Sequence, residues 1–291
     1  MRSVFILLFC CLIHQSTFGQ ILDLARIDYT TVPGSKSNFE YQRTRFIFNY
    51  PFKVGESGYF FAGLDYSKIN FQFQEEEDSF DKENTEDFTL LDLNLTYTVP
   101  LENDWRFAIQ ASPGVSSNFE SGYERADWVF SSIIVFIKDR KNSQSVKKPN
   151  RLIVGAAYSG SSGVAFPIPF ISYYRKFHPK WSYNVGAPIS NLQYHASEKF
   201  RMKLFATLDG FNANIQQEQT LAMGERANRL RLNMLLCGTR YEFKFSDRIE
   251  TYLTITRSFN SVIQLRDGRE RVQTFPTNDV MHYRTGIRVR I

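Results

Sequence analysis

The feature that most constrains this chain is a two-residue alternation of apolar and polar side chains. In the segment 91–99 every second residue is apolar, and the intervening residues are Asp92, Asn94, Thr96 and Thr98. The same pattern recurs in 200–209, 229–236 and 281–291. Because successive side chains on a strand point to opposite faces, these segments predict two-faced β-strands. Their length of about ten residues is that of a tilted strand crossing a membrane.

Turn-forming residues separate these segments, and short turns alternate with longer connections along the chain. Outer-membrane barrels have short periplasmic turns and longer outer loops. The alternation of short and longer connections therefore predicts a transmembrane antiparallel β-barrel. It gives fourteen strands, approximately 21–33, 39–50, 58–73, 87–99, 104–117, 126–138, 151–159, 166–177, 181–187, 189–195, 199–209, 228–245, 249–261 and 279–291. A twelve-strand alternative omits 21–33, fuses 181–195 and places the acidic segment 74–87 at the periplasmic end.

Two of the predicted strands change phase within themselves. In 58–73 the apolar face moves from Phe60, Ala62 and Leu64 to a later set that begins at Ile69. In 228–245 the apolar residues change from one face of the strand to the other after Gly238. Bulges at Gly63 and Gly238, or strands that extend past the membrane, would explain both changes.

Composition agrees with a barrel and excludes other classes. The chain has 291 residues, of which 43% are hydrophobic and 15% aromatic, so it is too apolar to be disordered. Its mean hydropathy is nevertheless −0.33. The alternation accounts for this, because polar residues lie between the apolar ones instead of being segregated from them.

The first nineteen residues have the pattern of a secretory signal peptide. Arg2 precedes an apolar run, Val4 to Ile13, and Thr17-Phe18-Gly19 forms a cleavage site after Gly19. We therefore expect a signal peptide at 1–19 and one domain at 20–291. The mature chain would retain a single cysteine, Cys237, so no internal disulfide is possible.

The main structural alternative is a secreted, soluble β-sandwich or barrel, which has the same alternation. Three features favour the membrane: the strand length, the aromatic residues at strand ends, and a last strand that runs to the apolar Ile291. We therefore expect the outer membrane as location and lipid as a partner.

One hairpin suggests a family. The segment from Pro188 to Phe200 contains a strand, the tripeptide Ser197-Glu198-Lys199 and the start of the next strand, and Ser246-Asp247-Arg248 repeats the tripeptide pattern. With the signal peptide and the alternation, the mature chain resembles the uncharacterised outer-membrane β-barrel proteins of Bacteroidota, a domain-of-unknown-function family. The resemblance implies an integral outer-membrane protein and brings no activity and no functional residues.

The polar face of the strands supplies the candidate functional residues. If the apolar face meets lipid, the other face lines the lumen. The expected basic wall of the lumen consists of Arg201, Lys203, Arg229, Arg231, Arg284, Arg288 and Arg290, and the expected acids are Asp65, Asp92, Asp209 and Glu250. Such a wall would attract small anionic solutes, as charged rings do in pores. Alternatively, these arginines pair with the acids and fill a plugged interior.

Other candidate sites are weaker. The acidic segment 75–87 lacks the spacing of a calcium loop, and the basic segment 138–148 has no aromatic residues interleaved with its charges, so neither metal nor nucleic-acid binding is expected. His195 and Ser197 share the spacing of the His-x-Ser pair in phospholipase barrels, but Asp209 replaces the expected amide. The dispersed histidines indicate no transition-metal site, and no cofactor is expected.

The sequence thus predicts a non-enzymatic, porin-like outer-membrane barrel that passes or binds small solutes, anionic ones if the basic wall lines the path. The alternatives are a plugged structural or interaction barrel and, less favoured, an outer-membrane lipid hydrolase. The sequence does not indicate an oligomeric state.

Overall fold

The computed structural model of the chain describes residues 23–34, 39–73, 85–141, 148–163, 167–221, 224–277 and 279–290. These residues form β-strands and short turns, among them a 3-10 turn at Arg125–Asp127. None of the helices within these ranges is long and apolar enough to cross a membrane. The predicted signal peptide and the acidic residues 75–83 lie outside the described ranges.

The strands are close to the predicted segments. They are β1 (Asp23–Val32), β2 (Phe39–Val54), β3 (Gly58–Phe73), β4 (Asp87–Pro100), β5 (Trp105–Ser117), β6 (Trp128–Arg140), β7 (Asn150–Ser159), β8 (Ile168–His178), β9 (Trp181–Ala187), β10 (Ile189–His195), β11 (Phe200–Thr220), β12 (Arg226–Lys244), β13 (Ile249–Asp267), β14 (Glu270–Pro276) and β15 (Met281–Arg290).

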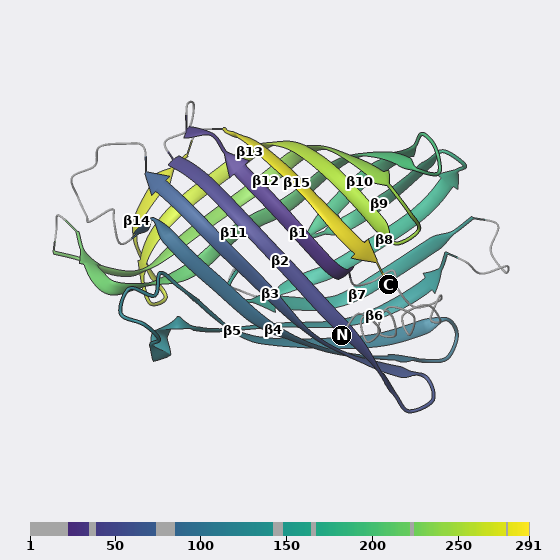
Figure 1. Cartoon of the computed structure of the whole chain (residues 1–291), viewed down its shortest axis with the longest axis horizontal. Coiled ribbons are helices and arrows are strands. Elements are labelled where there is room, and N and C mark those ends of the chain that lie inside the picture. The colour runs from purple at the N-terminus through teal and green to yellow at the C-terminus, as the bar shows by residue number, and fades with distance from the viewer. Residues whose placement is uncertain are drawn as a thin grey trace, which may run out of the picture.

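Consecutive strands pair antiparallel, and the sheet closes on itself to form a barrel (Figure 1). Pairing of β1 with β15 joins the first strand to the last, with Ile27 opposite Ile287. Fourteen strands form the closed barrel, and β14 is an added strand that pairs with an extension of β13 beyond the wall. The prediction of a fourteen-stranded barrel is confirmed. The twelve-strand alternative is wrong, because β1 is present and β9 and β10 are separate strands.

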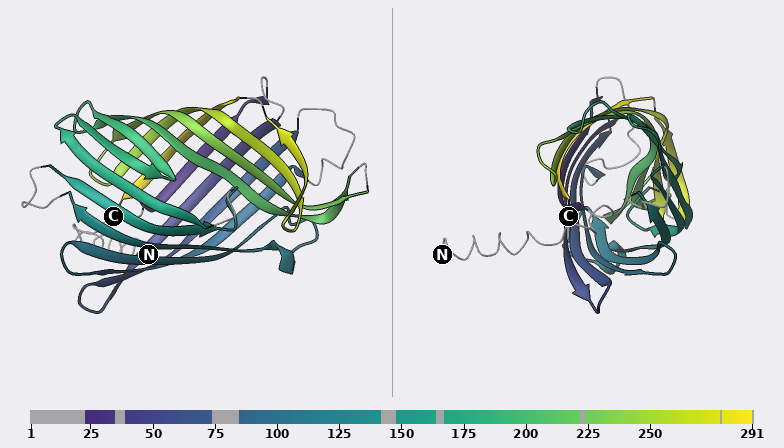
Figure 2. Two further views of the ribbon diagram at one scale, coloured as in Figure 1. Left: turned by 180° about the vertical axis from the view of Figure 1, so that it is seen from behind. Right: turned by 90° about the vertical axis from the view of Figure 1, so that its right-hand side faces the viewer.

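The two ends of the barrel differ. We call the end at which β1 starts and β15 finishes the terminal end, and the opposite end, where β11–β14 extend furthest, the loop end (Figure 2). Around the barrel wall, exposed apolar side chains form a belt. On β2 it runs from Phe46 to Val54, and on β4 it includes Leu91, Leu93 and Tyr97. Strands of a membrane barrel present such a continuous apolar surface to lipid.

The belt gives a first prediction. Leu253 lies on β13 within the belt, with 46% of its surface exposed. We expect Leu253→Arg to lower the free energy of unfolding in lipid vesicles by about 2–4 kcal/mol, because a charge on the lipid face loses its hydration. Thr44→Arg is the matched control, because Thr44 is exposed but lies on the loop-end side of Phe46. Equal effects of the two variants in a urea titration would contradict the placement of the belt.

Beyond the belt, the loop end contains a large apolar core, which we call the apolar cap. It consists of Val32, Phe39, Tyr41, Ile69, Phe71, Phe88, Leu90, Phe211, Ala213, Ile215, Leu221, Ala227, Leu230, Leu232, Met234, Leu236, Ile263, Leu265, Phe275 and Val280. The cap joins β1–β4 to β11–β14, so these two parts of the wall pack face to face at the loop end. Each large apolar side chain buried there contributes about 1.5–3 kcal/mol, so the cap stabilises this end of the barrel.

The cap explains the phase changes in the sequence. In β3, Leu64 is exposed in the belt, whereas Ile69 and Phe71 are fully buried in the cap. Pairing continues without a register shift through Gly63, and the shift between β12 and β13 lies at Leu235/Leu236, where Phe259 of β13 has no partner in the register, not at Gly238. Strands that extend past the apolar belt therefore account for the phase changes, and the alternative explanation by bulges at Gly63 and Gly238 is wrong.

The cap also reverses one expected face. If the apolar face meets lipid throughout, the apolar residues of 230–236 should lie outside, yet Leu230, Leu232, Met234 and Leu236 are at most 3% exposed. They point inward, towards Phe211 and the inner face of β1–β4. The alternation of β12 is as expected, but this part of the strand lies beyond the belt, where the apolar face turns to a protein core.

Candidate functional site in the barrel interior

A cavity of about 370 Å³ lies inside the barrel, below the apolar cap. Most of its lining residues are polar, and they come from both sides of the barrel: β2–β5 on one side, and β6–β8 and β11 on the other. Closed sheets place alternate side chains inside, so the polar face predicted from sequence becomes the lining of this cavity. It is the candidate binding site of the chain.

Ion pairs form one wall of the cavity. Arg45 donates two hydrogen bonds to Asp65, 2.8 and 2.5 Å long, in a bidentate pair between β2 and β3. Arg43 donates to Ser67 Oγ at 3.1 and 2.9 Å and lies 4.0 Å from Asp209 of β11. Because β2 and β11 are not neighbours in the sheet, the Arg43–Asp209 contact spans the interior.

Asp209 is the centre of a second set of contacts. Arg284 of β15 pairs with the Asp209 carboxylate and donates to Thr30 Oγ1 at 2.7 Å. The amide of Gly210 donates to Asp209 Oδ1 at 2.8 Å. Asp209 thus ties β11 to β2 and β15 across the barrel. Two of the predicted residues, Asp209 and Arg284, meet here as an ion pair rather than as separate parts of an acidic and a basic wall.

Asp92 differs from the other acids in the cavity. It lies opposite Asp65 on the neighbouring strand, but Arg45 is already engaged by Asp65. Within the described ranges Asp92 forms no ion pair, and its contact with Ser161 Oγ is long, at 3.4 Å. An ionised carboxylate in a cavity is costly without a cation or several donors. Asp92 therefore offers hydrogen-bond acceptance to a solute in the cavity.

Neutral polar groups complete the lining. Gln110 Nε2 donates to Asn94 Oδ1 at 3.1 Å and to Ser112 Oγ at 2.9 Å, and Ser112 Oγ donates to Asn94 at 2.8 Å. Serines from β6, β7 and the turn after β7 add hydroxyl groups. The cavity can thus accept and donate hydrogen bonds along much of its wall.

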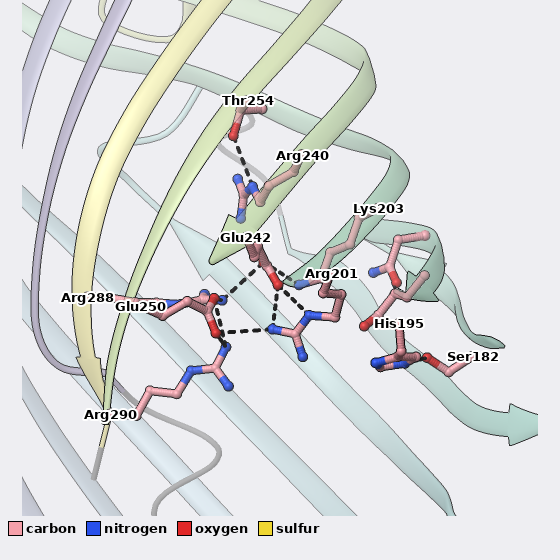
Figure 3. Close-up of polar contacts among 12 residues, drawn as sticks. Ser182, His195, Arg201, Lys203, Arg240, Glu242, Glu250, Thr254, Arg288 and Arg290 are labelled. Atoms are coloured by element: carbon pink, nitrogen blue, oxygen red, sulfur yellow. Dashed lines mark hydrogen bonds and ion pairs between the residues drawn. The ribbon is translucent and has the colours of Figure 1, made fainter. Parts of the chain in front are cut away.

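At the terminal end of the interior lies a second charged group, which we call the ion cluster (Figure 3). It consists of Arg201, Lys203, Glu242, Glu250, Arg288 and Arg290. Lys203 Nζ lies 2.6 Å from Glu242 Oε1, and Arg290 lies 3.0 Å from Glu250 Oε2. Arg201 and Arg288 each contact both carboxylates. Four cations thus share two carboxylates, which leaves an excess of positive charge at this end.

Glu242 is the member of the ion cluster that was not among the lumen acids expected from the sequence. It is 1% exposed and accepts from three cations of the ion cluster. The signal was available, because Arg240 and Glu242 continue the inward face of β12 beyond Gly238. Arg240 lies beside the cluster, donates to Thr254 Oγ1 at 3.0 Å, and stacks 4.8 Å from the Tyr252 ring.

The remaining members of the predicted basic wall lie elsewhere. Arg229 and Arg231 are on the opposite face of β12 from the apolar cap, near the loop end. Arg229 donates to the carbonyl of Ala126 at 3.0 Å, and Arg231 approaches Asn212 Oδ1 at 3.4 Å. The seven predicted cations therefore fall into three places: the ion cluster, the Asp209 pair and the loop end.

His195 and Ser197, whose spacing resembles a catalytic His-x-Ser pair, do not contact each other through their side chains in the bonds of the described residues. His195 Nε2 is 2.9 Å from Ser182 Oγ on the neighbouring strand β9 (Figure 3). Ser197 Oγ instead accepts from the backbone amide of Phe200 at 3.0 Å within the turn. The side chain that would serve as base and the hydroxyl two residues later thus have different partners.

The loop end of the interior is closed by the second half of β11. At Gly210 the strand adopts φ +143° and turns inward, where residues 211–216 are all buried. Its apolar side chains join the cap, whereas Asn212, Asn214 and Gln216 face the other way. Asn214 Nδ2 and Gln216 Nε2 each donate to Asp127 at 2.8 Å, and Asn212 Nδ2 donates to the Gly160 carbonyl at 2.8 Å. This segment separates the cavity from the loop end.

Comparison with solved structures gives distant similarities, among them a porin, an outer membrane channel and a toluene transporter. The KdgM porin in complex with disordered oligogalacturonate has 7% identity and a TM-score of 0.37, covering 91% of this chain and 98% of that chain. The COG4313 outer membrane channel from Pseudomonas putida F1 has 10% identity and a TM-score of 0.45, covering 95% and 99%. The P. putida toluene transporter TodX has 9% identity and a TM-score of 0.40, covering 92% and 90%.

No curated protein matches the chain. Its strand pairing is that of a closed antiparallel β-barrel with an apolar outer belt. One family model, described as a domain of unknown function (DUF6268), matches residues 35–290, almost the whole barrel. The chain therefore belongs to the DUF6268 family.

Proposed function

We propose that this protein resides in the outer membrane and binds and passes small polar solutes, with the interior cavity as its binding site. The observation that carries the proposal is the cavity itself, about 370 Å³ in volume and lined by charged, amide and hydroxyl groups from both sides of the barrel. Binding cavities for small molecules commonly begin at this volume. Residues 1–19 would direct export, and the Ser-Glu-Lys hairpin supports a source in Bacteroidota.

We further propose that the terminal end faces the periplasm and favours anions. The ion cluster brings four cations to two carboxylates, and Arg290 is the most exposed of these cations, with 28% of its side chain accessible. A positive opening raises the local concentration of anions and repels cations. The seven-residue basic wall predicted from sequence contributes to this field through Arg201, Lys203, Arg288 and Arg290.

Three sugars of similar size test both proposals in proteoliposome-swelling assays: glucuronate, glucose and glucosamine. We expect glucuronate to enter fastest and glucosamine slowest, because their charges differ while their sizes do not. Arg290→Gln should reduce the ratio of glucuronate to glucosamine rates by about two- to fivefold, since one exposed charge is removed. Arg257→Gln is the matched control, because Arg257 is an exposed arginine near the loop end, paired with Asp279.

The outcomes separate the alternatives. Swelling no faster than in protein-free liposomes would favour the plugged structural or interaction barrel. Faster entry of glucosamine than of glucuronate would retain passage but overturn the anion preference.

A further inference from the structure

Four arginines lie together on the outer face of the sheet beyond the apolar belt. In β12 Leu230 points into the apolar cap, so Arg229 and Arg231 lie on the opposite face. Arg229 is paired with Arg266 of β13, and Arg266 with Arg271 of β14, the added strand at the loop end (Figure 1). Residues directly opposite each other in a sheet share a face, so these three form a row across three strands. We call this row, together with Arg231, the arginine patch.

The patch has no counter-charge bound to it in the described part of the chain. Like charges directly opposite each other destabilise a sheet, and none of the four arginines forms an ion pair among the described residues. Their hydrogen bonds go to neutral oxygens: Arg229 donates to the Ala126 carbonyl at 3.0 Å, and Arg266 donates to Gln264 Oε1 at 3.1 Å. Burial, followed by repulsion from Arg266 and Arg229, lowers the pKa of Arg231.

Asp127 is a carboxylate close enough to act on the patch. It attracts Arg229, but it is fully buried, and its two oxygens accept hydrogen bonds from Asn214 and Gln216, each at 2.8 Å. One carboxylate that is engaged in this way offsets only part of the charge of four arginines. The patch therefore attracts an anion from outside the chain.

The spacing of the arginines indicates the kind of anion. Guanidinium groups bind phosphate through paired N–H donors, so arginine suits phosphate recognition. Neighbouring strands lie about 4.8 Å apart, so the row across β12, β13 and β14 spans about 10 Å. A single phosphate cannot contact all of the row, whereas a ligand with two or more phosphates can.

The height of the patch above the belt indicates what carries these phosphates. Leu235 of β12 is exposed and pairs with the exposed Leu208 of β11, at the edge of the belt. Arg231 and Arg229 lie about 13 and 20 Å from Leu235 along the strand, at about 3.3 Å per residue. With a strand tilt of about 40°, they lie about 10 and 15 Å above the belt. The headgroup layer of a phospholipid leaflet is only about 5–8 Å deep, so the patch is at the height of sugars on a glycolipid.

The turn after β7 separates the belt from the patch. A Cβ at Gly163 would lie 2.2 Å from Asn233 Oδ1, so this turn packs on the outer face of β12 between Leu235 and Arg231. Acyl chains that cover the belt therefore stop below the turn, and only a headgroup extends to the arginines.

We propose that the arginine patch binds the phosphorylated sugar headgroup of an outer-leaflet glycolipid, a lipopolysaccharide. The inference goes beyond the proposed passage of solutes and rests on the proposed function only for the outer-membrane location and the outward orientation of the loop end. It assigns a lipid to one side of the barrel, separate from the cavity and the ion cluster.

Native mass spectrometry of the mature protein in detergent tests the proposal. The probe is rough lipopolysaccharide, which has a short phosphorylated sugar core, and the comparison is the same lipid after enzymatic removal of its phosphates. We expect the protein to retain the phosphorylated form at least about tenfold more tightly, because charge-assisted bonds to phosphate are lost with the phosphates. Arg266→Gln combined with Arg271→Gln should abolish this preference.

Arg226→Gln combined with Arg257→Gln is the matched control. It removes two exposed arginines from the same end, and both of these have carboxylate partners, Glu218 at 3.3 Å and Asp279 at 3.2 Å. We expect this variant to retain phosphorylated lipopolysaccharide as the unmodified protein does.

A second variant covers a failure of the first to fold. Arg229→Gln combined with Arg231→Gln replaces Arg266→Gln with Arg271→Gln if the latter does not fold, as judged by the migration of unheated protein in SDS gels. It removes the other two members of the patch, and we expect the same loss of preference for the phosphorylated lipid.

Three results would overturn the inference. They are equal retention of the two forms of lipopolysaccharide, equal losses in the patch variant and its control, and complete displacement of the lipid by glucose 1,6-bisphosphate, which would assign the patch to soluble phosphate esters. All three are read in detergent, whether or not sugars enter liposomes. A failure of the lipid site is thus distinct from a failure of the proposed function.

Discussion

Glu242→Gln is expected to destabilise the barrel by about 3–5 kcal/mol, because it leaves buried cations without their counter-charge. Glu242 is 1% exposed and is contacted by Lys203, Arg201 and Arg288. The amide keeps the size of the side chain but removes its charge, so Glu250 alone must compensate the cluster. Urea titration in lipid vesicles, followed by the band shift between folded and unfolded protein, measures the change.

Asp279→Asn provides the control for an exposed ion pair. The Arg257–Asp279 pair has half-exposed side chains at 3.2 Å and should contribute less than about 1 kcal/mol. Lys203→Met, combined with Glu242→Gln, should recover part of the loss, because it removes one of the uncompensated charges. A loss below about 1 kcal/mol in Glu242→Gln would mean that water, and not Glu242, compensates the cations.

The strands and their order were predictable because the barrel repeats one simple rule. Alternation and turn parity are local signals, and both are strong in this chain, as in 91–99. The same rule misassigned the face of 230–236, since it assumes lipid outside every strand. Whether Leu232 meets lipid or a protein core depends on where it lies along the strand relative to the apolar belt. The alternation of apolar and polar residues does not contain that information.

Which charged residues form ion pairs was harder to predict from the sequence. The sequence supplies Asp209 and Arg284 on inward positions, but their contact joins β11 to β15, which are not neighbours in the sheet. Such contacts depend on how the closed sheet brings non-neighbouring strands together across the interior. The possibility that arginines pair with the acids was open from sequence, and the partners of Arg45, Arg284 and Arg288 required the three-dimensional arrangement.

The extra length of β11 was also missed, for a physical reason. The segment after Gly210 contains Asn212, Asn214 and three glutamines, which on a surface indicate a loop. Here Asn214 and Gln216 bond to Asp127 and Asn212 bonds to the turn after β7, while Phe211 and Ile215 fill the cap. Polar and apolar residues alternate because both faces of this segment are covered by protein.

Gly210→Ala tests the turn on which this closure depends. Gly210 has φ +143°, and a Cβ there would lie 2.0 Å from the Leu232 carbonyl oxygen. Both the backbone conformation and the β11–β12 pairing would therefore have to change. We expect a loss of at least about 3 kcal/mol in the free energy of unfolding, together with faster amide hydrogen exchange in 211–216.

Gly122→Ala separates the effect of backbone strain from the effect of the steric clash with β12. Gly122 also has a positive φ, +88°, but a Cβ there has nothing within 4 Å, so only backbone strain of about 1–2 kcal/mol is expected. If the turn at Gly210 holds the inward segment, Gly210→Ala alone should expose the 211–216 amides and weaken the cap around Phe211. Equal losses in the two variants, with unchanged exchange at 211–216, would show that the segment is held by its contacts with Asp127 and the cap rather than by the turn.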